Sequence, residues 1–249
     1  MQRYFIDQLI QVGQSLTLDD SISHHLLRVL RAKEGQEVYL VDPSHSLFLA
    51  TLVGGLHSGA EVLVKAQLDQ DVESPLEVTI ACGLSKNDKL EWIIQKGTET
   101  GAFAFHPIAL DRDVMVWKGD KAESKVSRLQ KIAQEAAEQA HRVQVPQVTY
   151  YKSLKAWLEE NHDWDIKLIA YEESAKAGEA STFKAALQIA KPGDRIVIVF
   201  GSEGGLTPSE VDQLRSAGFK PVGLGPRILR AETAPIYALS AISYQTELF

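Results

Sequence analysis

From Leu76 onward the chain alternates continuous apolar segments with amphipathic ones, and this alternation restricts the possible folds more than any other feature. Apolar runs without polar alternation are typical of strands buried on both faces, as in a parallel sheet that helices cover on its two sides. We therefore predict an α/β domain built on a parallel sheet. Its strands should be LEVTIACGL (76–84), AFHPIAL (104–110), DIKLIAY (165–171), DRIVIVFG (194–201) and FKPVGLG (219–225).

Helices are predicted between these strands. Asn87 can cap a helix over 87–100, which Gly101 would end. Apolar positions keep helical spacing over 122–143, and a last helix should begin at about Ala234. Helical crossovers of this kind are what successive parallel strands require.

The N-terminal part has a different pattern, with short β-type runs separated by Gly, Pro, Ser and His. One helix, from Ile22, interrupts them, so we predict a small β-barrel with a single helix. The polar segment 69–75 ends in proline and is interpreted as a linker, which gives domains at 1–70 and 76–249. The predicted strands of the first domain are VYLVD (38–42), LFLATLV (47–53) and EVLVKAQL (61–68).

Composition narrows the class of protein. The 249 residues include no apolar run long enough to cross a membrane, and the first residues lack the pattern of a secretion signal, so we expect a cytoplasmic protein. The single cysteine, Cys82, lies in an apolar run and is expected to be a buried thiol. The net charge of −7 argues weakly against nucleic acid, although it does not exclude local basic patches.

Two glycine-rich loops follow predicted strands, where open α/β sheets bind ligands. The first, FGSEGGLTPSE (200–210), lacks the lysine of a Walker-type phosphate loop and carries Glu203, which would repel phosphates. Thr207 and Glu210 predict a capping box at the start of the next helix. The second, GLGPRIL (223–229), has Ile228 where a dinucleotide fingerprint needs its third glycine. Neither loop therefore suits a nucleotide phosphate.

Glycines allow the backbone to approach a flat ligand closely, so the two loops together would suit an adenine ring and a ribose. An acidic neighbour tolerates a ligand with positive character, such as S-adenosylmethionine. Ordinary turns with a solvated Glu203 are an equal alternative. In the next segment, RILRAETA (227–234), Arg230 could hold an RNA phosphate or stabilise negative charge on a base. The alternative there is a surface arginine pair and a helix capped by Thr233.

Four ordered motifs resemble those of the RsmE-type ribosomal RNA methyltransferases of the SPOUT superfamily. They are KGTETGAFAFHPI (96–108), EAAEQAHRVQVPQV (135–148), FGSEGGLTPSE (200–210) and LGPRILRAETA (224–234), and HHLLRVLRAKEGQEVYLVD (24–42) also agrees. The resemblance implies a PUA-like N-terminal barrel that binds RNA and a SPOUT domain with a deep trefoil knot. It also implies a homodimer that uses S-adenosylmethionine. No His/Cys cluster in the sequence suggests a metal. The implied reaction methylates N3 of one uridine, uridine 1498 in the customary numbering, in 16S rRNA or the assembled 30S subunit.

The resemblance also implies roles for particular residues. Arg230 would stabilise the uridine anion, and Glu232 is a candidate base, with a helix-start role as its alternative. Ser202 stands where the family usually has proline. The implied cofactor residues are Tyr171, Gly201, Glu203, Gly204, Gly205, Leu224, Gly225, Ile228, Leu229, Thr233 and Ala234.

Basic residues could hold RNA despite the acidic total. The residues predicted to contact RNA are Arg3, Arg28, Arg31, Lys33 and Arg142, and a second basic cluster is formed by Lys118, Lys121 and Lys125. Solvated helix ends are the alternative for both clusters. Two other functions stay open: a related methyltransferase that acts on another base or on ribose, and an RNA-binding protein without catalytic activity.

Overall fold

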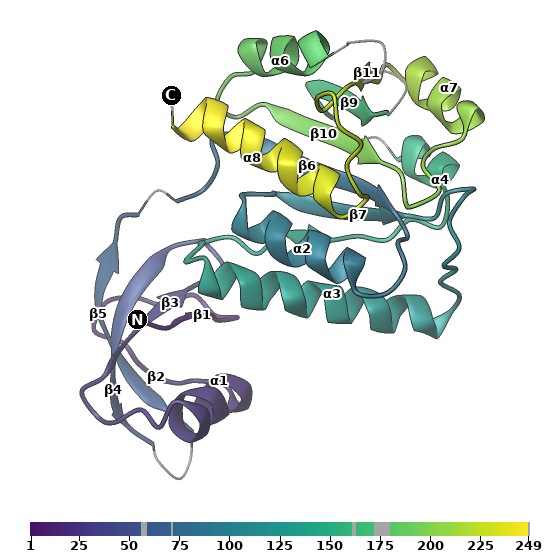
Figure 1. Cartoon of the computed structure of the whole chain (residues 1–249). Helices are drawn as coiled ribbons and strands as arrows, with labels where there is room; N and C mark the ends of the chain where they lie inside the picture. The colour runs from purple at the N-terminus through teal and green to yellow at the C-terminus, as the bar shows by residue number, and fades with distance from the viewer. Residues whose placement is uncertain (56–58, 71, 161–162, 172–179, 249) are drawn as a thin grey trace. The chain divides into compact units, whose positions relative to one another are not determined.

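The computed structural model describes residues 1–55, 59–70, 72–160, 163–171 and 180–248 of the chain. The protein forms two compact units (Figure 1). The first unit consists of Met1–Glu73 together with Ala137–Gln144, and the second of Ser74–Ala136 together with Val145–Phe249. Among the described residues, no helix is long and apolar enough to cross a membrane.

The first unit is built on a five-stranded sheet with the order β1-β3-β4-β5-β2. β1 pairs with β3 in parallel, and the other pairs are antiparallel. In Figure 1 the sheet curls, and its inner face and Leu26 form one core. The strands are β1 (Arg3–Phe5), β2 (Ser15–Thr17), β3 (Glu37–Val41), β4 (Leu47–Gly54) and β5 (Glu61–Leu68). The three longer strands were predicted, whereas β1 and β2 have three residues each and are too short to show alternation.

The predicted helix from Ile22 begins two residues earlier, at Asp20, and is less regular than expected. α1 (Asp20–His24) continues into one π-helical segment, η1 (His25–Val29). Arg31 then takes a positive φ of 54°, which ends the helix. Asp19 caps α1, since its carboxylate accepts a hydrogen bond from the Ile22 N–H at 2.9 Å.

The second unit is built on a six-stranded sheet with the order β11-β9-β10-β6-β7-β8, and all of its strands are parallel. The strands are β6 (Glu77–Gly83), β7 (Ala104–Ile108), β8 (Gln147–Val148), β9 (Ile166–Ala170), β10 (Arg195–Phe200) and β11 (Lys220–Val222). The parallel α/β fold predicted from the continuous apolar runs is confirmed.

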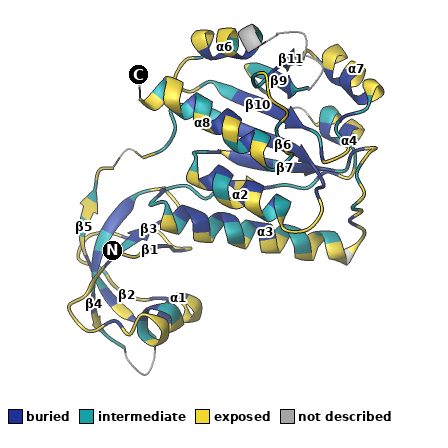
Figure 2. Cartoon of the chain, viewed as in Figure 1, coloured by how far each residue is buried: buried dark blue, intermediate teal, exposed yellow. Residues whose placement is uncertain are grey.

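Helices cover both faces of this sheet (Figure 2). In the central strand β10, Ile196 and Ile198 pack into one core, while Val197 and Val199 pack into the other. Helices α2, α3, α6 and α8 contribute to the first core, and α4 and α7 to the second. Their bounds are α2 (Lys89–Glu99), α3 (Asp120–Gln139), α4 (Leu154–Glu159), α6 (Ala180–Ile189), α7 (Pro208–Ser216) and α8 (Thr233–Glu247).

Three predicted helix ends are wrong. Asn87 does not cap α2: its own φ is +55°, and Asp88 occupies the position before the helix. The long helix α3 ends at Gln139 rather than at Val143, because His141 adopts a φ of +58°. Thr233 is the first residue of α8 and not its cap.

Other local predictions are confirmed. Gly101 takes a φ of +89° after α2, and Gly218 takes the same value after α7. Thr207 and Glu210 form the expected capping box at the start of α7. Cys82 is buried in the core, and burial raises the pKa of its thiol to about 12, so it stays protonated at neutral pH.

Candidate functional site

A cavity of about 610 Å³ opens at the carboxyl ends of β9, β10 and β11 in the second unit. Two loops form most of its wall: the β10 loop (201–207) and the β11 loop (223–232). Tyr171 closes it from the end of β9, and Lys89 from the start of α2. This is the edge of a parallel sheet where ligands bind, because successive crossovers leave a crevice there.

The glycines of the β10 loop are required by the protein's own backbone. A Cβ at Gly201 would meet the Gly205 Cα at 2.7 Å, and a Cβ at Gly204 would meet the Arg112 carbonyl oxygen at 2.8 Å. Gly205 itself takes a φ of +68°. The sequence had suggested that these glycines admit a ligand, but at 201 and 204 they first let one chain segment pass close to another.

A segment after β7, Asp111–Asp113, braces the β10 loop. The Arg112 guanidinium donates hydrogen bonds to the Gly204 carbonyl at 3.2 Å and to the Leu206 carbonyl at 3.1 Å. The Asp111 N–H donates to the Glu210 carboxylate at 2.9 Å, so the same segment also holds the start of α7. We call Asp111–Asp113 the brace segment.

The third residue of the brace segment, Asp113, binds backbone N–H groups with its side chain. One oxygen of its carboxylate accepts hydrogen bonds from the N–H groups of Leu84 at 2.8 Å and Leu110 at 2.9 Å. Burial raises the pKa of Asp113, although the neighbouring Ser202 hydroxyl opposes that shift. Ser202 is buried beside this carboxylate.

Lys89 connects the two loops of the cavity. Its Nζ lies 3.0 Å from Oε1 of Glu203 in the β10 loop and 3.4 Å from Oε2 of Glu232 in the β11 loop. Glu203 also accepts a hydrogen bond from the Lys86 N–H at 3.1 Å. Burial would raise the pKa of Glu203, but the bonds from Lys89 and the backbone outweigh it and lower that pKa. Hydrogen bonding to Glu203 in turn raises the pKa of Lys89.

This contact answers why the β10 loop carries a carboxylate. Glu203 is exposed, yet it is not a free charge that awaits a ligand, because its contact with Lys89 fixes the loop to α2. The lysine comes 114 residues earlier in the chain (203 minus 89). It reaches the loop because β6, which leads into α2, is paired with β10 in the sheet.

The β11 loop is more open than the β10 loop. Gly225 turns with a φ of +107°, and Ile228 is 75% exposed. The Arg230 side chain lines the cavity and is exposed, while its carbonyl accepts hydrogen bonds from the N–H groups of Thr233 and Ala234 at 2.9 and 3.0 Å. Arg230 therefore stands at the turn that begins α8.

The cavity gathers most of the residues that the sequence singled out. The ones that line it are Tyr171, Gly201, Glu203, Gly204, Gly205, Leu224, Gly225, Ile228, Leu229, Arg230 and Ala234. Glu232 and Thr233 are not on its wall. Lining residues that sequence reasoning missed are Lys89, Arg112, Ala170, Phe200, Ser202, Leu206, Pro208, Val222, Pro226, Arg227 and Ala231. Several of these are neighbours of the glycines, so closer attention to the loop ends could have found them.

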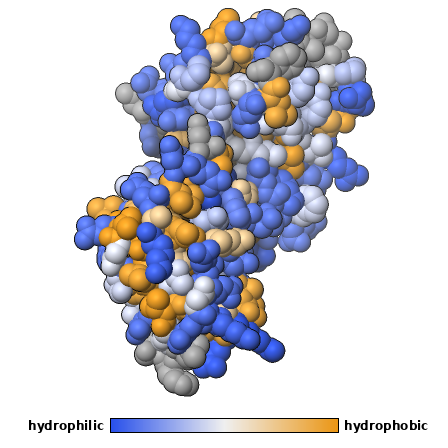
Figure 3. Space-filling model, turned by 90° about the vertical axis from the view of Figure 1, so that its left-hand side faces the viewer, coloured by the Kyte–Doolittle hydropathy of each residue, from blue (hydrophilic) through white to orange (hydrophobic). Residues whose placement is uncertain are grey.

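The basic residues of the first unit fall into two groups. Arg28, Arg31 and Lys33 are exposed. Arg3 and Arg142 are 1% and 5% exposed, and each guanidinium is used inside the protein. On the face shown in Figure 3, hydrophilic and hydrophobic side chains of this unit are interspersed rather than separated.

Arg3 and Arg142 fasten the segment 137–144 to the rest of the first unit. Arg3 donates to the carbonyls of His141 and Arg142, the latter at 3.1 Å, and to Oε1 of Gln70 at 2.7 Å. Nε of Arg142 donates to Oε2 of Glu73 at 3.0 Å. Both side chains thus have structural partners, and the prediction that they contact RNA receives no support from their placement.

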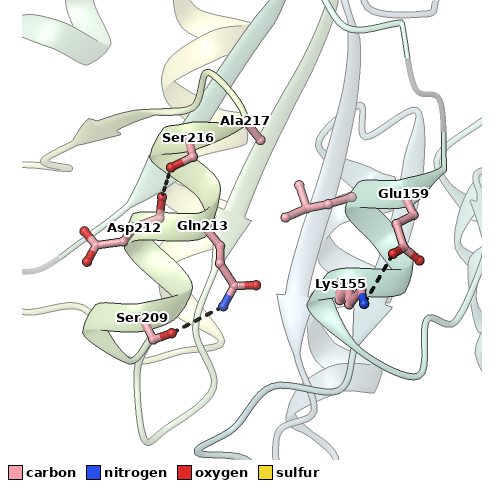
Figure 4. A pocket seen from close by; sticks show the side chains of 8 residues that line it. Lys155, Glu159, Ser209, Asp212, Gln213, Ser216 and Ala217 are labelled. Atoms are coloured by element: carbon pink, nitrogen blue, oxygen red, sulfur yellow. Dashed lines mark hydrogen bonds and ion pairs between the residues drawn. The ribbon is translucent and has the colours of Figure 1, made fainter.

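A second hollow lies between α4 and α7 (Figure 4). Its polar side chains contact residues one turn along their own helix. Lys155 lies 3.7 Å from Glu159, and Gln213 donates a hydrogen bond to Ser209 at 3.4 Å. The groove is open and has no group of convergent charges, so it is a weak candidate for a ligand site. Among the described residues, no group of three or more His, Cys, Asp and Glu side chains could hold a metal ion.

Comparisons with known proteins identify the family. Residues 72–243 match the family model of the RNA methyltransferase domain, and residues 18–57 match that of the RNA methyltransferase PUA domain. The chain is 45% identical to the ribosomal RNA small subunit methyltransferase E of Bacillus subtilis (strain 168), over 100% of this chain and 98% of that protein. It belongs to the RsmE family of ribosomal RNA methyltransferases.

Other RsmE proteins agree with this assignment. The RsmE of Synechocystis sp. (strain ATCC 27184 / PCC 6803 / Kazusa) is 32% identical over 95% of this chain and 75% of that protein. The crystal structure of the Neisseria gonorrhoeae RsmE bound to S-adenosyl methionine superposes with a TM-score of 0.85. That structure is 33% identical and covers 98% of this chain and 97% of that one. The resemblance carried by the four motifs is therefore confirmed, and so are the PUA domain and the SPOUT-type α/β domain.

Proposed function

We propose that this protein transfers a methyl group from S-adenosylmethionine to N3 of one uridine, uridine 1498, in the 16S rRNA of the small ribosomal subunit. Family membership supports an activity on ribosomal RNA. The observation that carries the finer proposal is the cavity at the carboxyl ends of β9, β10 and β11, with Arg230 on its wall.

The residues of the cavity fit this cofactor. Its volume of about 610 Å³ lies within the range of sites for small organic molecules. Leu224 and Leu229 supply apolar surface for a flat ring, and the glycines of both loops leave backbone groups accessible. Lys89 already neutralises Glu203, so the wall carries no unpaired cluster of negative charge from that side chain. The relative from Neisseria gonorrhoeae was crystallised with S-adenosyl methionine, which supports the same ligand here.

Arg230 is proposed to act on the uridine. When bound, S-adenosylmethionine supplies a methyl group activated by a sulfonium. Uridine N3 becomes a nucleophile when it loses its proton, and the positive guanidinium of Arg230 would stabilise the resulting anion. The N3 proton leaves to water, a new C–N bond forms, and the C–S bond breaks. Since N3 lies on the pairing edge of the base, the uridine must be unpaired or turned out of its stack.

Glu232 is proposed to position the β11 loop rather than to serve as the base. It is not on the cavity wall, and its Oε2 lies 3.4 Å from Nζ of Lys89. Glu232→Gln should therefore lower kcat/KM without moving the pH dependence of turnover. If the acid limb of the pH profile disappears in this variant, Glu232 is the base instead.

The remaining assignments are also proposals. Tyr171 and the lining residues of both loops would hold the cofactor, whereas Thr233, which is off the cavity wall, would only begin α8. Arg28, Arg31 and Lys33 would contact RNA phosphates from a PUA-like domain at 1–70, with the catalytic domain at 76–249 and its knot at the cofactor site. A homodimer in the cytoplasm is also proposed, and the exposed Tyr237 and Tyr244 of α8 are candidate residues for its interface.

One experiment tests the reaction and its target together. The purified protein is incubated with labelled S-adenosylmethionine and either naked 16S rRNA or 30S subunits from a strain that lacks it. Mass mapping then locates the methyl group. Label at N3 of uridine 1498 is the expected result. Label on another base or on a ribose would reassign the target, and no transfer to either substrate would leave only an RNA-binding role.

A further inference from the structure

A third cavity in the same unit, distinct from the groove between α4 and α7, has no role in the function proposed so far. Its volume is about 460 Å³, and it lies between the loop that follows β6 and the first turns of α3. The lining residues that bear on its chemistry are Ser85, Trp117, Lys121, Ser124, Lys125 and Arg128.

The cavity is basic. Lys121, Lys125 and Arg128 come from one face of α3, since residues three and four apart on a helix are neighbours. Of these, Arg128 is paired with Glu91, at 2.9 Å. The Lys125 ammonium lies 5.5 Å from the centre of the Trp117 ring, which keeps this cation at the wall. Three cations against one carboxylate form a local positive site in a chain whose net charge is −7.

Ser85 provides an observation that is independent of charge. It is 7% exposed and lines the cavity, and among the described residues its buried hydroxyl has no hydrogen-bond partner. Buried polar groups in proteins are almost always hydrogen-bonded, so an orphaned hydroxyl at the wall of a cavity indicates a missing partner. Lysine, arginine and hydroxyl groups can all donate, and their shared partner is an anion with several acceptor oxygens.

This basic cavity adjoins the cofactor cavity through one loop. Ser85 and Asn87 line the basic cavity, and Lys89, two residues further on, lines the cofactor cavity. Between them, the Lys86 N–H donates to Glu203 of the β10 loop at 3.1 Å. A strand of RNA whose target base enters the cofactor cavity could therefore place a neighbouring nucleotide at the basic one.

We propose that this basic cavity binds a backbone phosphate of the RNA substrate, on a nucleotide near the methylated uridine. This inference rests on the proposed function. The site takes a phosphate rather than a base because Trp117 is only 8% exposed, which leaves no ring face for stacking. Its role is to fix the position of the RNA, since phosphate contacts set register and carry no sequence information.

Paired double variants test the proposal. Lys121→Gln/Lys125→Gln removes two charges from the cavity wall. Lys131→Gln and Lys155→Gln together remove two charges from exposed lysines of the same unit that line neither this cavity nor the cofactor cavity. Binding of 16S rRNA is measured over a range of salt concentrations with the cofactor present, and cofactor binding is measured separately by calorimetry.

The expected result is a loss of RNA affinity of about tenfold for the cavity variant, with the slope of log affinity against log salt reduced by about 1. Ser85→Ala removes the hydroxyl without changing charge and should weaken RNA binding by about threefold at an unchanged slope. Inorganic phosphate should compete with RNA for the wild type more than for the cavity variant. Cofactor affinity should be the same in all variants.

Equal RNA affinity and equal salt slope in the cavity variant and the control variant would overturn the proposal. Binding of inorganic phosphate at this cavity without any effect on RNA affinity would also overturn it, because the site would then serve a free anion. These outcomes are distinct from a failure of the proposed function. In that case the wild type itself would neither bind nor methylate RNA, and both proposals would fall.

Discussion

The two loops that form the cofactor cavity are built in opposite ways. The β10 loop is held from several sides, by Arg112 at two of its carbonyls, by the N–H of Lys86 and by Lys89. The β11 loop is exposed at Arg227, Ile228 and Arg230. At its end, the Arg230 carbonyl accepts hydrogen bonds from the first N–H groups of α8. A fixed loop suits the binding of a cofactor whose shape is constant. An open loop suits contact with a large substrate that must enter and leave.

The largest expected effect comes from the open loop. Arg230→Ala should lower kcat by about 10²- to 10³-fold, because it removes the group that stabilises the developing anion. The affinity for S-adenosylmethionine should change by less than about threefold, since the fixed loop is untouched. Single-turnover methylation and calorimetry measure the two quantities. Arg227→Ala, on the same loop, is the matched control and should have a much smaller effect on kcat. An equal loss of turnover and of cofactor affinity in Arg230→Ala would show that this arginine binds the cofactor.

The next effect comes from the fixed loop. Gly204→Ala places a Cβ 2.8 Å from the Arg112 carbonyl oxygen, so the loop or the brace segment must move. We expect a loss of about 1–3 kcal/mol in the free energy of unfolding and weaker cofactor binding. Urea denaturation and calorimetry with S-adenosylmethionine measure them.

Gly225→Ala is the control for this substitution in the open loop. Its nearest contact would be the Tyr237 hydroxyl at 3.8 Å, so only the strain of the φ of +107° remains. That strain costs about 1–2 kcal/mol. If Gly225→Ala weakened cofactor binding more than Gly204→Ala, the assignment of the fixed loop as the main cofactor support would be wrong.

A smaller effect is expected at the link between the loops. Lys89→Met removes the ammonium that contacts Glu203 and Glu232. We expect kcat/KM to fall by about three- to tenfold, because the open loop loses its connection to the fixed one. Lys96→Met is a control on the same helix, where the ammonium pairs with Glu99 at 2.8 Å. Equal kcat/KM values in Lys89→Met and Lys96→Met would show that Lys89 does not connect the two loops.

The smallest effects concern pH, and the two carboxylates near the fixed loop should act in opposite directions. The pKa of Glu203 is lowered from 4.5, so its pairing stabilises the folded state above that pH and is lost as the pH falls through the lowered pKa. The pKa of Asp113 is raised from 3.8, so the folded state loses stability as the pH rises from that value to the raised pKa.

Glu203→Gln should therefore be less stable than the wild type at pH 7 and about equal to it in acid. Asp113→Asn should lose the part of the pH dependence that destabilises the wild type between pH 3.8 and the raised pKa, and it should gain stability relative to the wild type as the pH rises through that interval. Thermal unfolding between pH 3 and pH 7 measures both differences. Parallel curves for the wild type and both variants would mean that neither carboxylate has a shifted pKa.

Elements that repeat a local pattern could be predicted from the sequence. The strands β6 and β10 are continuous apolar runs, and the capping box of Thr207 and Glu210 lies within four residues. The two glycine loops could be placed at one sheet edge because each follows a strand. The four motifs then indicated the family.

The supports of the site could not be predicted in the same way. Lys89, Arg112 and Asp113 are ordinary residue types at ordinary positions, and only the pairing of β6 with β10 and β7 brings them to the β10 loop. Arg3 and Arg142 have the charge expected for RNA contact, yet burial and the partners Gln70 and Glu73 use both inside the protein. A side chain's charge is visible in a sequence, whereas its exposure is not.

Calorimetric titration of the wild-type protein and the Gly204→Ala variant with S-adenosylmethionine tests the central claim most directly. That claim is that the fixed and open loops together hold the cofactor at one edge of the parallel sheet. We predict saturable binding at one site per chain for the wild type, weakened in the variant. No heat of binding for the wild type at millimolar ligand, or equal affinity in the two proteins, would contradict it.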